Sequence, residues 1–222
     1  DSLTTRRVLE GLMDTADDEA ARQRLVASLR ERLDASERTL AAIAAVPRHA
    51  FVPDRYRSRA YDDRPLPIGH EQTISAPHMV AVITDLLDLD SGDAVFEVGT
   101  GCGYHAAVVA EIVGPGNVYS VERVPELAEA ARKRLDRLGY DVTVRAGDGR
   151  DAFAERPAFD AAYLTCAPAD GVPDQIVDRV RTGSRIVAPV GRDGAQRLVR
   201  LTVDEEGLDR EDFGGVRFVP MR

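Results

Sequence analysis

The chain has 222 residues, 44% of them hydrophobic and 30% charged, which is enough for one domain with a well-buried core and excludes a long disordered chain. Its formal net charge of −9 argues against a nucleic-acid-binding protein, because a negative surface repels phosphates. No run approaches the roughly 20 apolar residues of a membrane span, and the two cysteines have neither zinc-site spacing nor a disulfide framework, so we expect a soluble, cytoplasmic protein with no metal and no membrane partner.

The first 46 residues (1–46) are predicted to form a helical extension packed on the rest of the protein. Four apolar residues recur at helical spacing among charges: Leu25, Val26, Leu29 and Leu33. A second helix is expected over residues 38–45, and Pro47 ends it. A short dimerisation arm is the alternative for this extension, but we expect a monomer.

Residues 47–92 are predicted to form a loop that serves the active site, followed by a helix. Residues that break regular structure recur between positions 47 and 77: Pro47, Pro53, Pro65, Pro67, Gly69 and Pro77. A loop of that length in a compact domain is usually functional. The helix is expected to start near Pro77, a favourable first-turn residue, with Ser75 close to its cap.

Residues 93–222 alternate between short apolar runs and amphipathic stretches. Strands are expected over 94–98, 117–121, 142–146, 159–164 and 184–190, and helices over 105–113, 125–138 and 172–180. This alternation predicts an α/β fold, a three-layer sandwich in which helices cover both faces of a mostly parallel sheet. Two further apolar segments, 197–203 and 216–219, are expected as C-terminal strands, one of them antiparallel at the edge.

A glycine-rich motif follows the first strand of this α/β region. It runs Gly99-Thr100-Gly101-Cys102-Gly103-Tyr104, and glycines let a ligand approach the backbone closely. The third glycine comes one residue early for a dinucleotide fingerprint, and no Gly-Lys-Ser/Thr follows as in a P-loop. The spacing favours a nucleoside ligand without pyrophosphate. A tight strand-to-helix turn without a ligand is the alternative.

An acidic residue ends the next strand, where a ribose is gripped in such folds. Glu122 falls 23 positions after Gly99, and its two oxygens can accept hydrogen bonds from the 2′ and 3′ hydroxyls. A helix-cap carboxylate before Pro125 is the alternative. We count the neighbouring Arg123 with the cofactor site.

Two further acidic residues are candidates for the same ligand. Asp148, followed by Gly149, is predicted to bond an adenine amino group, although Asp-Gly is also a common turn pair. Glu97 is expected to orient the glycine loop or to lie near the amino-acid part of the ligand. Carboxylates near the site suit a sulfonium cation.

Two motifs together resemble a known family. The run from Glu97 to Tyr104 resembles the S-adenosylmethionine-binding signature of class I methyltransferases. The preceding segment is similar to protein-L-isoaspartate O-methyltransferases, as are shorter stretches elsewhere: Arg64–Gly69, Gln72–Met79, Val46–Arg48, Phe51–Pro53 and the tail 216–220. The resemblance spans about residues 38–222, and residues 72–77 are its most discriminating part.

The resemblance implies a Rossmann-like class I methyltransferase that binds S-adenosylmethionine, releases S-adenosylhomocysteine and uses no metal. It implies methyl transfer to the free carboxylate of L-isoaspartyl residues, and of some D-aspartyl residues, in damaged proteins and peptides. The ester then collapses to a succinimide, which partly reopens as normal aspartate. In the family, the serine of the Thr-Ile-Ser motif lies at the active site, and that position is Ser75 here.

The chemistry of a carboxylate acceptor fits these residues. A carboxylate has a pKa of about 4, so it attacks the methyl group without a strong general base. The enzyme must align it with the methyl–sulfur bond and remove water from it. We expect Ser75 to hold one carboxylate oxygen with help from Thr73, and Ile74 and His78 to lie on the substrate side. A structural role at the helix start is the alternative for His78.

Two positions depart from the family pattern. Glu71 stands where relatives usually have glycine or another small or neutral residue, and it adds negative charge beside a site for an anionic substrate. Cys102 replaces a more usual serine. Both Cys102 and Cys166 are expected to be inert packing thiols, because a redox sensor would require a depressed pKa.

Two other functions stay open at this point. A class I methyltransferase that acts on an RNA base usually has a basic face and stacking aromatics, whereas this chain is acidic with 5% aromatic residues; a small-molecule acceptor is the related case. A non-catalytic adaptor that retains the fold is the second. The presence of Ser75, Glu122 and the glycine loop weighs against lost chemistry.

Overall fold

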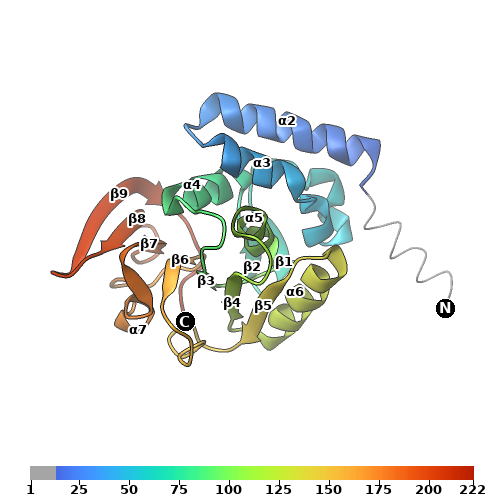
Figure 1. The fold of residues 1–222 in the computed structure, drawn as a ribbon. Coiled ribbons are helices and arrows are strands. Elements are labelled where there is room, and N and C mark those ends of the chain that lie inside the picture. Colours follow the sequence, from blue (N-terminus) through green and yellow to red (C-terminus); the bar gives the residue numbers. More distant parts are fainter. Residues whose placement is uncertain (1–13) are drawn as a thin grey trace.

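A seven-stranded sheet forms the centre of the protein, for which a computed structural model describes residues 14–222 (Figure 1). The strands lie in the order β5 (Val142–Ala146), β4 (Val118–Glu122), β3 (Val95–Val98), β6 (Phe159–Leu164), β7 (Val180–Val190), β8 (Gln196–Val203) and β9 (Leu208–Val216). The strands from β5 to β7 run parallel, whereas β8 and β9 are antiparallel to their neighbours. The mostly parallel sheet is therefore confirmed, and its antiparallel edge has two strands.

Helices cover both faces of this sheet, as the alternation predicted. On one face, α4 (Pro77–Leu87) and α5 (Tyr104–Val113) pack in one apolar cluster with Leu135 of α6 (Pro125–Leu138). On the other face, Phe153 and the short helix α7 (Asp174–Val177) pack against β3 and β6. The apolar residues of β3 alternate between the two clusters, so burial on both faces fixes the register of the sheet.

The N-terminal helices form an outer layer over α4 and α5 (Figure 1). Helix α2 (Ala16–Arg32) begins with a capping box in which Thr15 and Asp18 exchange hydrogen bonds. Helix α3 (Glu37–Ala45) lies between α2 and α5, and it ends just before Pro47. Both helices agree with the sequence pattern. The boundaries of the three predicted segments, after residues 46 and 92, stay a prediction.

The segment between α3 and α4 is more regular than the loop that we expected. It contains two 3₁₀ helices, η1 (Arg48–Phe51) and η2 (Asp54–Arg59), and a hairpin of β1 (Leu66–Gly69) and β2 (Gln72–Ile74). The turn places His70 and Glu71 in the left-handed region, with φ of 50° and 58°. Neither residue is typical of such a turn, which is why the sequence did not reveal the hairpin.

Two further sequence predictions were wrong in part. The helix expected over 172–180 is only the four residues of α7, and Val180 already begins β7. The strand expected over 216–219 ends at Val216, because β9 uses the preceding charged residues instead. Helix α4 starts at Pro77 as predicted, and Ser75 lies next to its N-cap Ala76, although no side chain caps that helix.

Candidate functional site

A cavity of about 380 Å³ opens at the carboxyl ends of β3, β4 and β6, the usual ligand position in open α/β sheets. It is lined by the glycine loop, the end of β4, the β1–β2 hairpin and the C-terminal tail. Eleven predicted site residues line it: Thr73, Ile74, Ser75, Glu97, Gly99, Thr100, Gly101, Cys102, Tyr104, Glu122 and Arg123. Four do not: His78, Gly103, Asp148 and Gly149. The sequence motifs from two distant parts of the chain therefore meet in one space.

Glycine is required at different positions of the loop for different structural reasons. A Cβ on Gly99 would lie 2.2 Å from Oγ1 of Thr165, which donates a hydrogen bond to the Gly99 carbonyl at 2.5 Å. Gly103 has a φ of 90° and forms the N-cap of α5, where a Cβ would lie 3.1 Å from Leu135. Gly101 also lines the cavity; its φ is 55°, and a Cβ there would lie 3.3 Å from Cδ1 of Ile68 in β1.

Glu122 holds the glycine loop in place at the floor of the cavity. It is 6% exposed; its Oε2 accepts a hydrogen bond from the Gly101 amide at 2.8 Å, and its Oε1 accepts one from the Val124 amide at 2.9 Å. Val124 is the N-cap of α6, which has no side-chain cap, so Glu122 bonds the residue before the helix and not a free amide of its first turn. Each carboxylate oxygen retains a second lone pair, which leaves Glu122 able to accept from a ligand as well.

Asp148 is directed to a neighbouring arginine. The Arg150 side chain donates to both carboxylate oxygens, at 2.9 and 2.5 Å, and this contact lowers the Asp148 pKa to about 2. Gly149 packs against β3, where a Cβ would lie 2.6 Å from a Val98 methyl. Only Gly147 of this turn lines the cavity.

Glu97 lies under the glycine loop in a buried polar network. Its carboxyl accepts hydrogen bonds from the Ser120 hydroxyl and, at 2.8 Å, from the Tyr163 hydroxyl, and Ser120 also bonds Thr100. Burial raises the Glu97 pKa to about 8 against the two hydrogen bonds, which lower it. The network connects β3, β4 and β6 to the loop, which agrees with an orienting role for Glu97.

Replacing Glu97 by glutamine is expected to remove a pH dependence of stability. The folded pKa of about 8 exceeds the usual glutamate value of 4.5, so the protonated carboxyl's contribution to folding stability is complete below pH 4.5 and is lost as pH rises through 8. The wild type should lose up to about 1.4 kcal/mol per pH unit within that window. Urea unfolding of wild type and Glu97→Gln at pH 5, 7 and 8.5 measures the difference, with the exposed Glu126→Gln as control. A difference between the two proteins that does not change with pH would contradict the burial argument.

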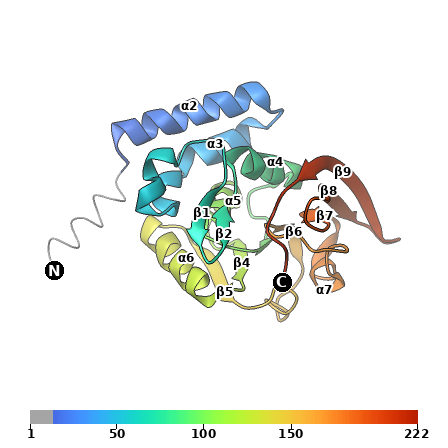
Figure 2. The same cartoon turned by 180° about the vertical axis from the view of Figure 1, so that it is seen from behind.

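The hairpin brings Thr73 and Ser75 to the border between this cavity and a second one of about 770 Å³. The second cavity adds His78, Met79, Phe218 and the tail, and the tail runs beside the end of β6, where Pro220 pairs with Ala167 (Figure 2). The two cavities therefore share Thr73 and Ser75 as lining residues.

His78 is held by a neighbouring carboxylate. Its Nδ1 lies 2.9 Å from Oδ1 of Asp63, which also accepts the His78 amide at 2.9 Å. Asp63 in turn binds Arg32 of α2 at 2.7 Å. These contacts favour a structural role for His78 at the start of α4, although His78 also borders the second cavity.

The two departures from the family pattern have identifiable surroundings. Glu71 lies at the hairpin turn, where Oε2 is 3.9 Å from Nη2 of Arg222, so a positive charge faces the additional negative one. Burial raises the pKa of Cys102, and burial raises that of Cys166 to about 12. Both thiols are free and line the cavity, and neither has the depressed pKa of a redox sensor.

The sequence did not identify several of the lining residues. Thr165 follows β6, and the tail from Val219 to Arg222 reaches the cavity only because residue 220 pairs with residue 167. The signal for Thr165 was its place at the end of a predicted parallel strand. The tail was visible only in the family resemblance.

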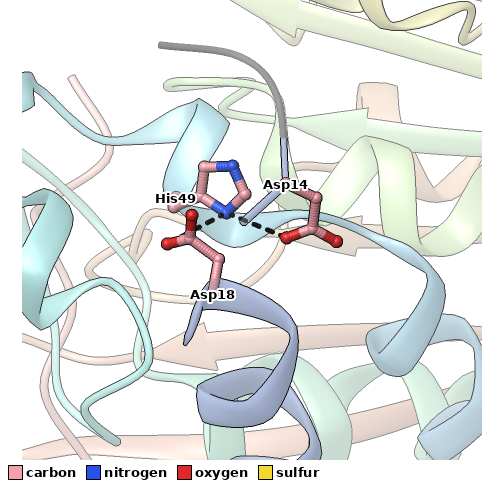
Figure 3. A group of neighbouring side chains, drawn as sticks. All are labelled: Asp14, Asp18 and His49. Atoms are coloured by element: carbon pink, nitrogen blue, oxygen red, sulfur yellow. Dashed lines mark ion pairs between the residues drawn. The ribbon is translucent and has the colours of Figure 1, made fainter. Parts of the chain in front are cut away.

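A separate group of metal-ligand residue types lies outside the cavity (Figure 3). In the part of the chain that the structure describes, Asp14, Asp18 and His49 bring their ligand atoms within 4.8 Å of one another. Each carboxylate already binds a cation: Asp14 binds Arg22 at 2.5 Å, and Asp18 binds Arg57 at 2.6 Å. The group is therefore an ion-pair network that ties the start of α2 to η1 and η2.

None of the described helices is long and apolar enough to cross a membrane.

Comparison with known proteins agrees with the motifs. The family model of protein-L-isoaspartate(D-aspartate) O-methyltransferases matches residues 20–222. Protein-L-isoaspartate O-methyltransferase 2 of Archaeoglobus fulgidus is 50% identical over 209 residues, which cover 93% of this chain and 94% of that protein. The corresponding enzyme of Methanothrix thermoacetophila is 49% identical over 202 residues, with 90% and 94% covered.

A solved structure of a protein-L-isoaspartate O-methyltransferase has the same fold. It superposes with a TM-score of 0.82 and is 27% identical over 90% of this chain, and the chain spans 65% of the length of that protein. The Rossmann-like fold expected from the resemblance is confirmed. Since the family model and the two archaeal relatives cover nearly the whole chain, the chain belongs to the protein-L-isoaspartate(D-aspartate) O-methyltransferase family.

Proposed function

We propose that this protein transfers a methyl group from S-adenosylmethionine to the free carboxylate of L-isoaspartyl residues in damaged proteins, and of D-aspartyl residues as a second substrate. One observation carries the proposal. The hairpin with Thr73, Ile74 and Ser75 lines the same cavity as the glycine loop and Glu122, so a methyl donor and an acceptor would meet there. Membership of the family supports the choice of acceptor.

The residues around the cavity fit S-adenosylmethionine. Glu122 has acceptor capacity left for two ribose hydroxyls, and the glycines of the loop let a ligand approach the backbone that lines the cavity. The negative charge of Glu122 suits a sulfonium cation. When bound, S-adenosylmethionine supplies an electrophilic methyl group. The proposed cofactor-binding residues are those of the sequence prediction: Glu97, Gly99, Thr100, Gly101, Cys102, Gly103, Tyr104, Glu122, Arg123, Asp148 and Gly149. Asp148 would reach the ligand only by exchanging its contact with Arg150.

Positioning, rather than proton transfer, is the task of the protein in this proposal. The acceptor carboxylate is ionised at neutral pH and needs no general base. Ser75 donates a hydrogen bond to one carboxylate oxygen and leaves the other to attack, while Thr73 assists and Ile74 and His78 border the peptide. Enclosure of the carboxylate between the hairpin and the tail removes water from it. The methylated substrate then leaves the enzyme, and its ester collapses to the succinimide.

The test is methyl transfer from labelled S-adenosylmethionine to a matched peptide pair, one isoaspartyl and one aspartyl. We expect base-labile label on the isoaspartyl peptide alone. Label on neither peptide, despite measured cofactor binding, would refute the proposed acceptor and direct the search to small molecules or RNA. Absence of cofactor binding as well would favour a non-catalytic adaptor.

The finer features of the proposal are a monomeric, cytoplasmic enzyme that needs no metal and binds neither nucleic acid nor membrane. Support comes from the acidic composition and from the ionised acceptor, which gives a metal no necessary role. Turnover is expected to remain within about twofold after dialysis against EDTA, because positioning alone would carry the reaction. Loss of turnover that added Zn²⁺ or Mg²⁺ restores would overturn the metal-free reaction. Light scattering of the dialysed protein tests the monomer.

A further inference from the structure

A fully buried arginine lies behind the segment that carries Ser75. Arg48, in η1, is 0% exposed. Its hydrogen bonds within the described residues go to backbone carbonyls: Nη1 donates to Ala60 at 2.7 Å, and Nη2 donates to Ser75 at 2.8 Å and to Arg64 at 3.3 Å. One side chain thus joins the end of η2, the start of the hairpin and the residue before the cap of α4.

Burying a guanidinium without a carboxylate partner costs desolvation free energy. An apolar side chain would fill the same space without that cost. Arg48 forms no ion pair with a carboxylate in residues 14–222, and burial lowers its pKa. What a guanidinium provides and an apolar residue cannot is a planar set of donors. Without Arg48, the carbonyls of Ala60, Arg64 and Ser75 would each lose the hydrogen bond that this guanidinium donates to them.

The same guanidinium also lies over the ring of Tyr104, a residue that lines the cavity. Its carbon lies 5.4 Å from the centre of the Tyr104 ring, which is within cation–π distance. Tyr104 begins α5, lines the cavity and is also held edge-to-face by Phe51, with ring centroids 5.6 Å apart. Arg48 therefore contacts both the segment of Ser75 and the first residue of the glycine-loop helix.

We propose that Arg48 is a positioning residue for methyl transfer: by binding the Ser75 carbonyl and the Tyr104 ring, it fixes the acceptor side of the cavity against the cofactor side. The inference rests on the proposed function, and it assigns to Arg48 no contact with either substrate. The Ser75 hydroxyl has no hydrogen-bond partner in the described protein, so the fold places it through the Ser75 backbone, which Arg48 binds.

The first test compares Arg48→Lys with Arg22→Lys in the methyl-transfer assay. Arg22 is a matched control, because it is 8% exposed and binds Tyr61 and Asp14, but it does not contact Ser75. A lysine at 48 cannot reach all three carbonyls, so kcat is expected to fall about 10- to 100-fold, the scale of a misplaced reacting group. The affinity for S-adenosylmethionine should stay within about threefold. Normal kcat in Arg48→Lys, or an equal loss in Arg22→Lys, would overturn the proposal.

The second test combines Arg48→Lys with Ser75→Ala. If Arg48 acts through Ser75, the double variant should be no slower than Ser75→Ala alone, because residues that act as a unit are not additive. Multiplied losses would show that Arg48 acts elsewhere. If Arg48→Lys does not fold, Arg48→Gln takes its place, and failure of both to fold would reduce Arg48 to a structural residue.

A third measurement is independent of activity and separates failure of this inference from failure of the proposed function. Amide hydrogen exchange over residues 72–79 is expected to be at least 10-fold faster in Arg48→Lys than in wild type, and unchanged in Arg22→Lys. If wild type methylates no isoaspartyl peptide but this difference appears, the proposed function is wrong and the positioning contact is correct. Unchanged exchange in Arg48→Lys overturns the inference whatever the activity.

Discussion

Replacing Ser75 by alanine is expected to lower kcat for an isoaspartyl peptide about 100-fold while the affinity for S-adenosylmethionine stays within about twofold. The reason is the place of the side chain. Ser75 borders both cavities, and α4 begins at Pro77 without a side-chain cap, so its hydroxyl is not used by the fold. Loss of the hydroxyl removes a donor to the acceptor carboxylate and leaves Glu122 and the glycine loop unchanged.

Steady-state kinetics and calorimetry of the same preparation check this expectation. Ser58→Ala is a suitable control, since Ser58 is an exposed serine of the same segment. Thr73→Val should show a smaller loss, about 10-fold or less, if the second hydroxyl only assists. Near-normal turnover of Ser75→Ala would refute the role of Ser75, and a parallel loss of cofactor affinity would move that role to the cofactor side.

Replacing Glu122 by glutamine is expected to weaken the binding of S-adenosylmethionine and S-adenosylhomocysteine about 100-fold, or about 2.7 kcal/mol. The carboxylate binds the Gly101 and Val124 amides with its two oxygens. A glutamine can offer only one oxygen, so its amino group would face one of these N–H groups. The bond to the loop and the bond to the ribose would both lose their charge assistance, which is about half of the 1.5–3 kcal/mol that such a bond contributes, so the two losses together are about 1.5–3 kcal/mol.

Calorimetric titration with S-adenosylhomocysteine and with its 2′-deoxy analogue separates the two contributions. If Glu122 binds the ribose, the deoxy analogue should lose affinity to wild type and little more to Glu122→Gln. Equal losses to both proteins would mean that Glu122 acts only by holding the loop. Glu126→Gln, an exposed change four residues later, should alter neither affinity.

Local patterns were sufficient to predict much of the α/β region. The apolar run before Glu122 and the amphipathic stretch from Pro125 gave that strand and helix nearly their observed bounds, because propensity and burial agree there. The glycine motif was likewise legible, since Gly99 and Gly103 need their positive φ for reasons of backbone geometry.

The rest depended on partners that are distant in the sequence. Strand β9 is charged and exposed, and only its pairing with β8 makes it a strand. Arg48 donates hydrogen bonds to carbonyls 12, 16 and 27 residues away, and such contacts leave no periodic pattern in the sequence. The Asp148 carboxylate binds Arg150. The sequence alone does not show whether this carboxylate binds the arginine or points into the cavity.

The two thiols beside the cavity have a consequence for chemoselectivity. Thiolates are much stronger nucleophiles than carboxylates, so a thiolate at Cys102 or Cys166 would compete for the activated methyl group and alkylate the enzyme itself. The same burial that makes the thiols poor redox sensors keeps them protonated, with the pKa of Cys166 raised to about 12. An ionised carboxylate is then the reactive nucleophile in the cavity at neutral pH. Burial of the two cysteines thus prevents their methylation by S-adenosylmethionine, so the enzyme can keep cysteines in its active site.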